Sequence, residues 1–271
     1  MEENKIRFGE YQLYNPKIRG MTFAMAKVIL KIFGSFDTSS SHLHFMRIVE
    51  KVAKTRLNTV LDAGCGDGKF SFWLAQKYPN AKIDACDLSE EIINRCKEIQ
   101  GGLKTRNVNF FVQDLRNLKS EGAYDFIFSN HVLEHVIDNQ LVISNLVSSL
   151  NREGYLYIQI PTAIQKRLSF GKRFLRSHEA WAKKEHIGQT LTLSLLSSEL
   201  KRLDCKILIA RHTEGFWGEL RFELKELALG YLQSRILLGL FFPLLHILGY
   251  IDSLVNCSDG NGILILAKKK H

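Results

Sequence analysis

Residues 60–69 read VLDAGCGDGK, an apolar segment that ends in an acidic residue and continues into three glycines at alternate positions. Glycine adopts left-handed backbone conformations that other residues resist, so the run predicts a tight turn at the end of a strand. The residues after it, KFSFWLAQKY, have the pattern of a helix. Two classes of cofactor are bound by a glycine-rich turn after a first strand, and the rest of the sequence must distinguish them.

Strand and helix patterns alternate along most of the chain. Helices are expected over residues 69–78, 89–99 and 139–150, and strands over 58–64, 81–88, 108–115, 124–130, 154–161, 205–212 and 262–270. Strands that alternate with helices form parallel sheets. Several of these strands are continuous apolar runs, as expected when both faces of a sheet are covered. The sequence therefore predicts an α/β fold with a doubly wound, mostly parallel sheet.

Length, charge and cysteine content limit the class of protein. The chain has 271 residues, a net charge of +9 and five dispersed cysteines without a C-x-x-C motif. This cysteine usage disfavours a disulfide framework or a zinc cluster and fits a reducing cytoplasm. The basic balance favours an anionic partner. Residues 1–17 have no apolar core, so we do not expect a signal peptide.

The glycine turn does not fit a dinucleotide. The dinucleotide pattern is G-x-G-x-x-G, whereas here the third glycine comes one residue early and Lys69 occupies its place. Asp62, at the end of the strand, would also face the pyrophosphate of a dinucleotide. S-adenosylmethionine has no phosphate and carries a sulfonium and an ammonium group, so a carboxylate at this position favours it.

Two further carboxylates follow neighbouring strands. Asp87 ends the second strand, 19 residues after Gly68, and can accept hydrogen bonds from both ribose hydroxyls. Asp114 ends the third strand and can accept from an exocyclic amine of adenine. Asp87 could instead cap the next helix, but Ser89 is an alternative cap. Since ligands of parallel sheets bind at the carboxyl ends of strands, these residues predict one site.

The segments VLDAGCGDG, IDACDLSEEII, FFVQDL, YDFIFSNHVLEHV and LNREGYLYIQIP together resemble the class I S-adenosylmethionine-dependent methyltransferases. The resemblance is greatest to the subgroup with S-N-x-V-L-E-H-V after the fourth strand, and it covers residues 58 to about 212. It implies a seven-stranded sheet with a reversed last strand and S-adenosylmethionine as cofactor. The residues that it implies in cofactor binding are Asp62, Gly64, Cys65, Gly66, Gly68, Asp87, Leu88, Asp114, Leu115 and Asn130.

The resemblance also suggests a division of the chain. We expect an N-terminal basic arm and helix over residues 1–41 and a methyltransferase domain over residues 42–271. The domain would include a basic cap over residues 165–190 and an apolar helical insert over residues 216–258, before the last strand.

Histidines after the fourth strand are the candidate catalytic residues. His131 and His135 titrate near neutral pH and are the first and second candidates for a general base, with His186 a third. His131 could equally be a wall of the pocket. The motif H-x-x-E-H at residues 131–135 also occurs in metalloproteases, but its position in a cofactor fold disfavours zinc, and we predict no metal. Cys65 is interpreted as a small residue that fills the turn.

The expected acceptor is a small molecule or a lipid-type anionic substrate. Residues 165–184 mix basic and aromatic side chains, including Phe170, Phe174 and Trp181, which suits an anionic lipid headgroup or nucleic acid. Residues 236–251 carry no formal charge and predict a core or interface helix pair, or a helix lying on a membrane surface, rather than a full span. Peripheral membrane contact through residues 20–34 and 236–251 is therefore expected, and nucleic acid is disfavoured.

Other functions remain open at this point. A non-catalytic protein that keeps the fold as a binding or scaffold module, and an RNA methyltransferase, are the alternatives. Lys69 disfavours a dehydrogenase. We expect a cytoplasmic protein; the alternative is a protein associated peripherally with the inner face of the membrane.

Overall fold

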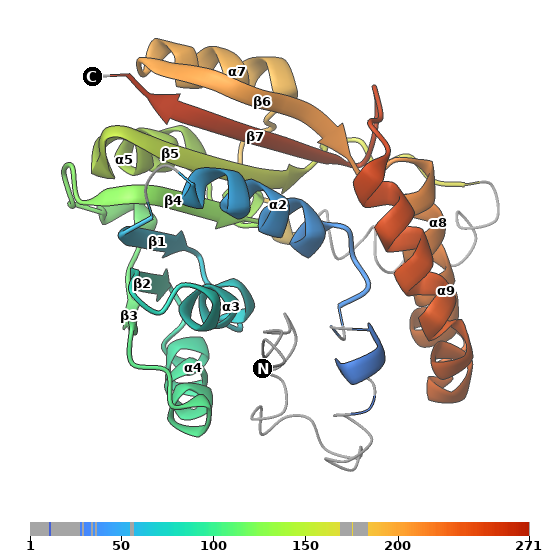
Figure 1. Ribbon diagram of the computed structural model, residues 1–271. Coiled ribbons are helices and arrows are strands. Elements are labelled where there is room, and N and C mark those ends of the chain that lie inside the picture. The colour runs from blue at the N-terminus through green and yellow to red at the C-terminus, as the bar shows by residue number, and fades with distance from the viewer. Residues whose placement is uncertain are drawn as a thin grey trace.

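A computed structural model describes residues 11, 28, 30–33, 35, 37–54, 57–168, 175 and 184–270 of the chain. Seven strands form one sheet in the order β3-β2-β1-β4-β5-β7-β6, and β7 runs antiparallel to both of its neighbours (Figure 1). The strands are β1 (Thr59–Ala63), β2 (Lys82–Asp87), β3 (Val108–Val112), β4 (Tyr124–Asn130), β5 (Leu150–Pro161), β6 (Cys205–Thr213) and β7 (Gly262–Lys269). The predicted α/β fold and its reversed last strand are confirmed.

Helices cover both faces of the sheet (Figure 1). One layer contains α2 (Ser41–Ala53), α3 (Lys69–Lys77) and α4 (Glu90–Leu103), and the other contains α5 (Asn139–Ser149) and α7 (Leu193–Arg202). Alternate residues of each strand serve the two layers: Val60 and Phe126 pack in the first core, and Leu61 and Ile127 in the second. This period of two on continuously apolar strands explains why those strands lack a polar face.

An aromatic cluster fixes α2 against the sheet. The ring of Phe45 lies 4.5 Å from Phe70, 4.7 Å from Phe128 and 5.6 Å from Tyr157, measured between centroids. Burying such a side chain contributes roughly 1.5–3 kcal/mol each. The cluster joins α2, α3, β4 and β5, so it also holds the first turn of α2 beside the carboxyl ends of the strands.

The insert before β7 differs in part from the prediction. It contains α8 (Phe216–Glu226), the π-helix η5 (Leu227–Tyr231) and α9 (Arg235–Leu254), and α8 and α9 lie side by side beyond the ends of the strands (Figure 1). A helix pair was one of the alternatives expected over residues 236–251, and the structure has a single helix there that continues through Pro243. Pro243 is exposed, so water can satisfy the carbonyl that loses its partner.

Helix α9 is buried on one face only. Leu245 and Leu248 are 0% and 4% exposed, whereas Ile236 and Leu240 are 79% and 72% exposed. Within the described part of the chain, Ile236–Leu254 is the one helix long and apolar enough to cross a membrane, with 28% of that stretch buried. Asp252 ties the end of the helix into the fold, because its carboxylate accepts hydrogen bonds from Ser40 and from the amides of residues 215 and 218.

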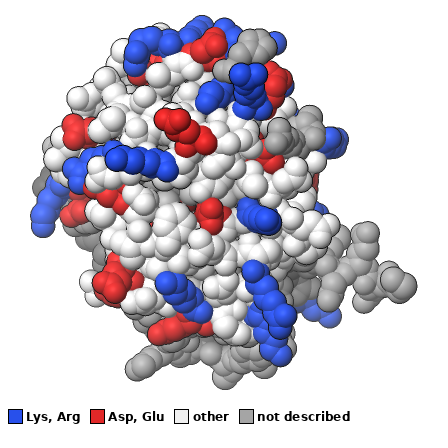
Figure 2. Space-filling model, turned by 90° about the vertical axis from the view of Figure 1, so that its left-hand side faces the viewer, with Lys and Arg blue, Asp and Glu red and all other residues white. Residues whose placement is uncertain are grey.

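Much of the predicted N-terminal helix and basic cap lies outside the described residues. Of residues 23–33, those described are 28 and 30–33, which are helical, with Leu30 buried. Phe170, Phe174 and Trp181 are not among the described residues. On the side of the molecule where the parallel strands begin, acidic and basic side chains are intermixed among uncharged residues (Figure 2).

Candidate functional site

The turn between β1 and α3 has glycine at three positions where the backbone is left-handed, and at two of them a side chain would also collide. Gly64, Gly66 and Gly68 have φ angles of +88°, +52° and +74°, in the region that favours glycine. A Cβ at Gly64 would lie 2.3 Å from the side chain of Val132, and one at Gly68 would lie 2.8 Å from Phe72. A Cβ at Gly66 would meet nothing within 4 Å, because this residue faces open space.

Asp62 lies beneath the turn. Its side chain is 2% exposed, and its Oδ2 accepts a hydrogen bond of 2.7 Å from the Ser71 hydroxyl of α3. Burial, partly offset by that hydrogen bond, raises the pKa of Asp62 to about 8. At neutral pH this group is therefore mostly a neutral hydrogen-bonding bridge between β1 and α3.

A cavity of about 560 Å³ opens at the carboxyl ends of β1, β2 and β4 and beside the segment after β3. It brings together ten of the predicted residues: Gly64, Cys65, Gly66, Asp87, Leu88, Asp114, Leu115, Asn130, His131 and His135. The predicted cofactor residues Asp62 and Gly68 are not in its wall. The two thus support the turn from behind, while the others face the cavity.

Asp87 connects the turn to the start of α4. Its Oδ2 accepts from the amide of Gly66 at 3.0 Å, and its Oδ1 accepts from the amide of Ser89 at 3.0 Å. Ser89, and not Asp87, caps α4 through a hydrogen bond from the amide of Ile92. The carboxylate is held in place by two backbone donors, and each oxygen keeps capacity for a ligand.

Asp114 and two leucines line the same cavity. Asp114 pairs with Arg116, whose Nη2 lies 2.6 Å from Oδ2. The hydrogen bonds from Arg116 lower the pKa of Asp114, so it is a carboxylate at neutral pH. Leu88 is 66% exposed beside Asp87, whereas Leu115 is 7% exposed after Asp114. An apolar surface between two carboxylates is suited to a nucleoside.

Two contacts from the N-terminal segment reach the glycine turn, and the sequence did not indicate either. Tyr11 donates a 2.6 Å hydrogen bond to Asp67 and is 3% exposed. Asp37 pairs with Lys69 at 3.1 Å. Burial alone would raise the pKa of Asp37, but the charges of Lys69 and His42 outweigh it and hold the pKa well below its usual range.

His131 occupies the point where β4 ends. Its φ of +57° is left-handed, which a histidine adopts only where surrounding contacts hold it, and its amide donates to the carbonyl of Gln159 at 2.8 Å. Its Nδ1 lies 3.4 Å from Oε1 of Glu134, a residue whose side chain is 9% exposed. Burial lowers the pKa of His131, but the hydrogen bond and charge of Glu134 outweigh it, so the net pKa is raised.

His135 and His186 complete the group around Glu134. Nδ1 of His135 lies 2.9 Å from the carbonyl oxygen of Glu185, and its ring centroid is 5.2 Å from that of His186. The short helix η3 (Leu133–His135) is 3₁₀, so the H-x-x-E-H motif does not place two histidines one α-helical turn apart. Ligand atoms of Glu134, His135 and His186 nevertheless lie within 4.8 Å of one another, although the sequence predicted no metal.

A second cavity, of about 720 Å³, adjoins the first. His131 and His135 belong to the walls of both. The remaining wall of the second cavity comes from the end of β5 and the segment after it, from residues 186–191 and from α8. The two cavities therefore meet at the histidines after β4.

A family model matches the part of the chain that forms the sheet ends and the first cavity. Residues 54–203, more than half of the chain, match the family model described as a methyltransferase domain. The chain belongs to this methyltransferase family. Its sheet and cofactor cavity identify it as a class I S-adenosylmethionine-dependent methyltransferase, as the sequence motifs predicted.

Curated relatives match part of this methyltransferase. The malonyl-[acyl-carrier protein] O-methyltransferase 1 of Ilyobacter polytropus is 37% identical over 95 residues, which are 35% of this chain and 35% of the relative. A trans-aconitate 2-methyltransferase of Escherichia coli is 33% identical over 130 residues, 45% of this chain and 50% of the relative. The chain thus matches between about a third and half of the length of these relatives.

A solved structure resembles the fold over most of the chain. The phosphoethanolamine N-methyltransferase 2 of Haemonchus contortus, in complex with phosphomonomethylethanolamine and S-adenosylhomocysteine, gives a TM-score of 0.60 at 18% identity. The match covers 92% of this chain and 57% of that one. At this identity the likeness concerns the fold alone.

Cys65 is a structural residue of the methyltransferase turn. Its thiol is 5% exposed and lies 3.8 Å from the carbonyl oxygen of Gly66. The hydrogen bond with Cys96, and then burial, raise the pKa of the Cys65 thiol far above neutral pH. The thiolate that a reactive cysteine requires is therefore suppressed.

Proposed function

We propose that this methyltransferase transfers the methyl group of S-adenosylmethionine to an oxygen or carbon of a small or lipid-type anionic acceptor. The observation that supports this most is the meeting of two cavities at His131 and His135. One cavity has the strand-end residues expected for the nucleoside, and the other has room for a second substrate. An in-line displacement requires this arrangement, since donor and acceptor must approach from opposite sides of the methyl group.

The first cavity is the proposed cofactor site. Gly64 and Gly66 would contact the amino-acid and ribose portions of the cofactor, Asp87 the ribose hydroxyls, and Asp114 the adenine amine. Leu88 and Leu115 would lie against the ring, and Asn130 would line the inner wall beside His131. The cofactor supplies an electrophilic methyl group on a sulfonium. The protein positions it and excludes water, so that dissipation of the positive charge is favoured.

We propose a supporting rather than a ligating function for Asp62. It is buried, bonded to Ser71 and mostly neutral, so it cannot contribute a full negative charge near the sulfonium. The electrostatic preference for a cation would then come from Asp67 and Asp87, the two carboxylates of the cavity wall nearest the glycine turn in the sequence and its contacts.

The names of the curated relatives favour O-methylation of a carboxylic acid, because malonyl groups and trans-aconitate carry carboxylates. A carboxylate acceptor is already a nucleophile and needs no base. A hydroxyl acceptor would need one, and His131, oriented by Glu134, is the proposed residue. His135 is the second candidate, although its Nδ1 is already directed at the carbonyl of Glu185.

The test is a transfer assay with deuterated-methyl S-adenosylmethionine and metabolite extracts from wild-type and deletion strains. A product heavier by one labelled methyl group, whose unmethylated precursor accumulates in the deletion strain, would support the proposal. Calorimetry with S-adenosylhomocysteine separates the alternatives. Cofactor binding without transfer to any small molecule would favour a scaffold, and transfer to RNA with a steep salt dependence would favour an RNA methyltransferase.

We also propose peripheral contact with an anionic membrane through residues 20–34 and 236–251. Leu244, Ile247 and Leu254 continue the exposed apolar stripe of α9 at 43%, 56% and 57% exposure. Because Asp252 holds the helix in the fold, a helix lying on the surface is favoured over one that spans. Sedimentation with vesicles of anionic lipid at low salt tests this. Full recovery of the wild-type protein in the supernatant would contradict the proposal. So would a dimer in which the apolar stripe of α9 is buried between the two copies. Either result would favour a cytoplasmic protein without membrane contact.

A further inference from the structure

The second cavity is lined by charged side chains whose pairing is uneven. Glu134, Glu214 and Glu219 contribute carboxylates to its wall, and Arg167 and Arg221 contribute guanidinium groups. A buried charge is costly unless a partner compensates for it. The pairing of each arginine therefore indicates which one is part of the scaffold.

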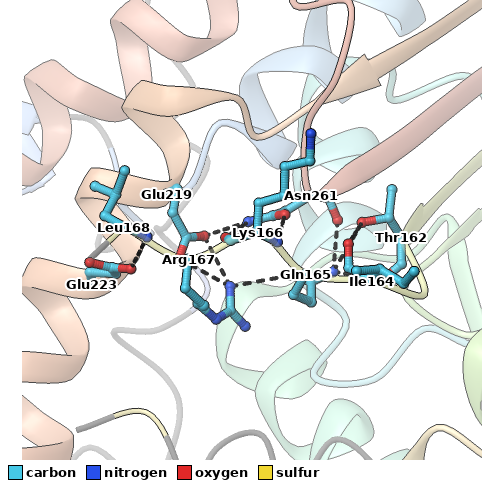
Figure 3. A network of polar contacts seen from close by, with 9 residues as sticks. All are labelled: Thr162, Ile164, Gln165, Lys166, Arg167, Leu168, Glu219, Glu223 and Asn261. Atoms are coloured by element: carbon cyan, nitrogen blue, oxygen red, sulfur yellow. Dashed lines mark hydrogen bonds and ion pairs between the residues drawn. The ribbon is translucent and has the colours of Figure 1, made fainter. Parts of the chain in front are cut away.

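Arg167 belongs to the scaffold. Its Nη1 lies 3.1 Å and 3.0 Å from the two carboxylate oxygens of Glu219, and both side chains are nearly buried (Figure 3). Asn261 donates a further hydrogen bond to Glu219, and Glu223, one turn along α8, accepts from the amide of Leu168 (Figure 3). These contacts tie the segment after β5 to α8 and leave the Arg167 charge compensated.

Arg221 lies on α8 two residues after Glu219 and is 6% exposed. Its one hydrogen bond to a described residue runs from Nη1 to the hydroxyl of Thr38, at 3.2 Å. Its Nε has no partner, and within the described part of the chain no carboxylate oxygen lies within ion-pair distance. A guanidinium is always charged at neutral pH, so this cation is buried without a counter-charge.

The backbone around Arg221 holds its side chain in place. A Cβ at Gly249 of α9 would lie 2.1 Å from the carbonyl oxygen of Thr38 and 3.4 Å from Cδ of Arg221. The absence of a side chain at this position lets α9 approach closely and confines the arginine stem between α9 and the segment before α2. The guanidinium is thus positioned in the cavity wall before any ligand arrives.

We propose that Arg221 is the binding residue for a carboxylate group of the methyl acceptor. This rests on the proposed function, since it assigns the second cavity to the acceptor. The acceptor's carboxylate supplies the counter-charge that the described protein residues do not, and the group to be methylated extends toward His131 and His135. Neutral analogues of the acceptor are then rejected because they leave the arginine buried and unpaired.

The experiment measures carboxylate binding to the full chain saturated with S-adenosylhomocysteine. The probes are trans-aconitate, malonate and succinate, with trimethyl trans-aconitate as the neutral control, and the readout is titration calorimetry. The wild-type protein should bind at least one acid and not the ester. Arg221→Gln should weaken that binding at least tenfold, and Arg221→Lys should weaken it less. Arg202→Gln, a matched change in the exposed ion pair with Glu199 on α7, should have no effect.

A second variant separates ligand binding from a structural function. Arg221→Met keeps the length of the side chain and removes the buried charge, so its melting temperature without ligand should equal or exceed that of the wild type. Addition of the acid should raise the melting temperature of the wild type alone. Equal acid affinity in Arg221→Gln, equal binding of acid and ester, no binding of any probe acid by the wild type, or a lowered melting temperature in Arg221→Met would overturn the proposal. S-adenosylhomocysteine affinity, measured in every variant, reports separately on the cofactor site.

Discussion

The two cavities of this methyltransferase are built in different ways. Apart from Ile187, the wall of the first comes from residues 64–137, at the carboxyl ends of β3, β2, β1 and β4, which are neighbours in the sheet in that order. The wall of the second is assembled from residues 131–135, 160–167, 186–191 and 214–222. A cavity made from consecutive strand ends can be recognised from local motifs, whereas a cavity assembled from distant segments depends on tertiary packing. The comparison predicts that substitutions in one cavity leave binding in the other intact.

The largest expected effect is that of Gly66→Val. Its side chain would extend into open space in the first cavity, so S-adenosylhomocysteine binding should fall below detection by calorimetry. The cost to folding is limited to the left-handed backbone, about 1–2 kcal/mol. Gly64→Ala is the matched control. Its φ is also positive, and its side chain would collide with Val132, so it should lower the melting temperature more than Gly66→Ala does. If Gly66→Val bound S-adenosylhomocysteine as tightly as the wild type, the first cavity could not be the cofactor site.

A change at the junction of the cavities should separate chemistry from binding. If the acceptor is a hydroxyl, His131→Gln should lower kcat by about 10²–10⁴-fold, the usual contribution of a general base. The dissociation constant of S-adenosylhomocysteine should change little. His135→Gln is the control at the second candidate. With a carboxylate acceptor, both variants should keep most of kcat, which decides between the two acceptor classes.

Asp62→Asn tests whether this carboxyl supports the turn. The raised pKa, about 8, means that the folded state keeps a proton that the unfolded chain releases near pH 4. Stability is therefore fully present at low pH and falls as the pH rises toward 8. The amide variant should flatten this decline and raise the free energy of unfolding above that of the wild type at pH 7 and, by more, at pH 8. Urea unfolding at pH 5 and pH 8 measures it. An unchanged pH dependence would contradict the buried, neutral assignment.

Glu134→Gln should act through the pKa of His131. The carboxylate raises that pKa, so its removal should move the acidic limb of the kcat/KM profile, which a general base sets, to lower pH. Because its pKa is raised in the folded state, His131 contributes to the free energy of unfolding. This contribution is complete at low pH and is lost as the pH rises through the folded-state pKa. Asp138→Asn, a nearby exposed acid, serves as the control. A limb that does not move would show that His131 does not set it.

The smallest expected effect is that of chelation. Although Glu134, His135 and His186 lie close together, the sequence predicts no metal, and transfer from a sulfonium does not require one. We expect EDTA to leave kcat/KM unchanged, with the same result after dialysis and addition of Mg²⁺ or Zn²⁺. A loss of kcat/KM that one cation restores would instead show that the cluster of Glu134, His135 and His186 binds a metal needed for activity.

The sequence predicted the first cavity well because its signals are local. The glycines, Asp87 and Asp114 follow strands that are recognisable from their apolar runs, and parallel strands bring their ends together. Asp62 shows the limit of this reasoning. Its position at a strand end was correct, but its burial depends on Ser71, a residue on the next helix that the motif does not specify.

The second cavity could not be derived in the same way. Arg221 is one of many basic residues in the sequence, and its burial depends on the close approach of α9 at Gly249. Helix α9 continues through Pro243, which is exposed to water, and the pattern of residues 236–251 did not decide between one helix and a pair. These features arise from contacts between residues far apart in the chain, for which a single sequence carries no spacing rule.

The contacts of Tyr11 and Asp37 with the glycine turn bear on where the catalytic unit begins. A chain shortened to start at residue 42, the predicted domain boundary, would remove the ion-pair partner of Lys69 and would expose the ring face of Phe72 on which Tyr11 stacks. Tyr11 and Asp37 thus contribute to the support of the glycine turn, and a protein truncated at residue 42 would report on an altered site.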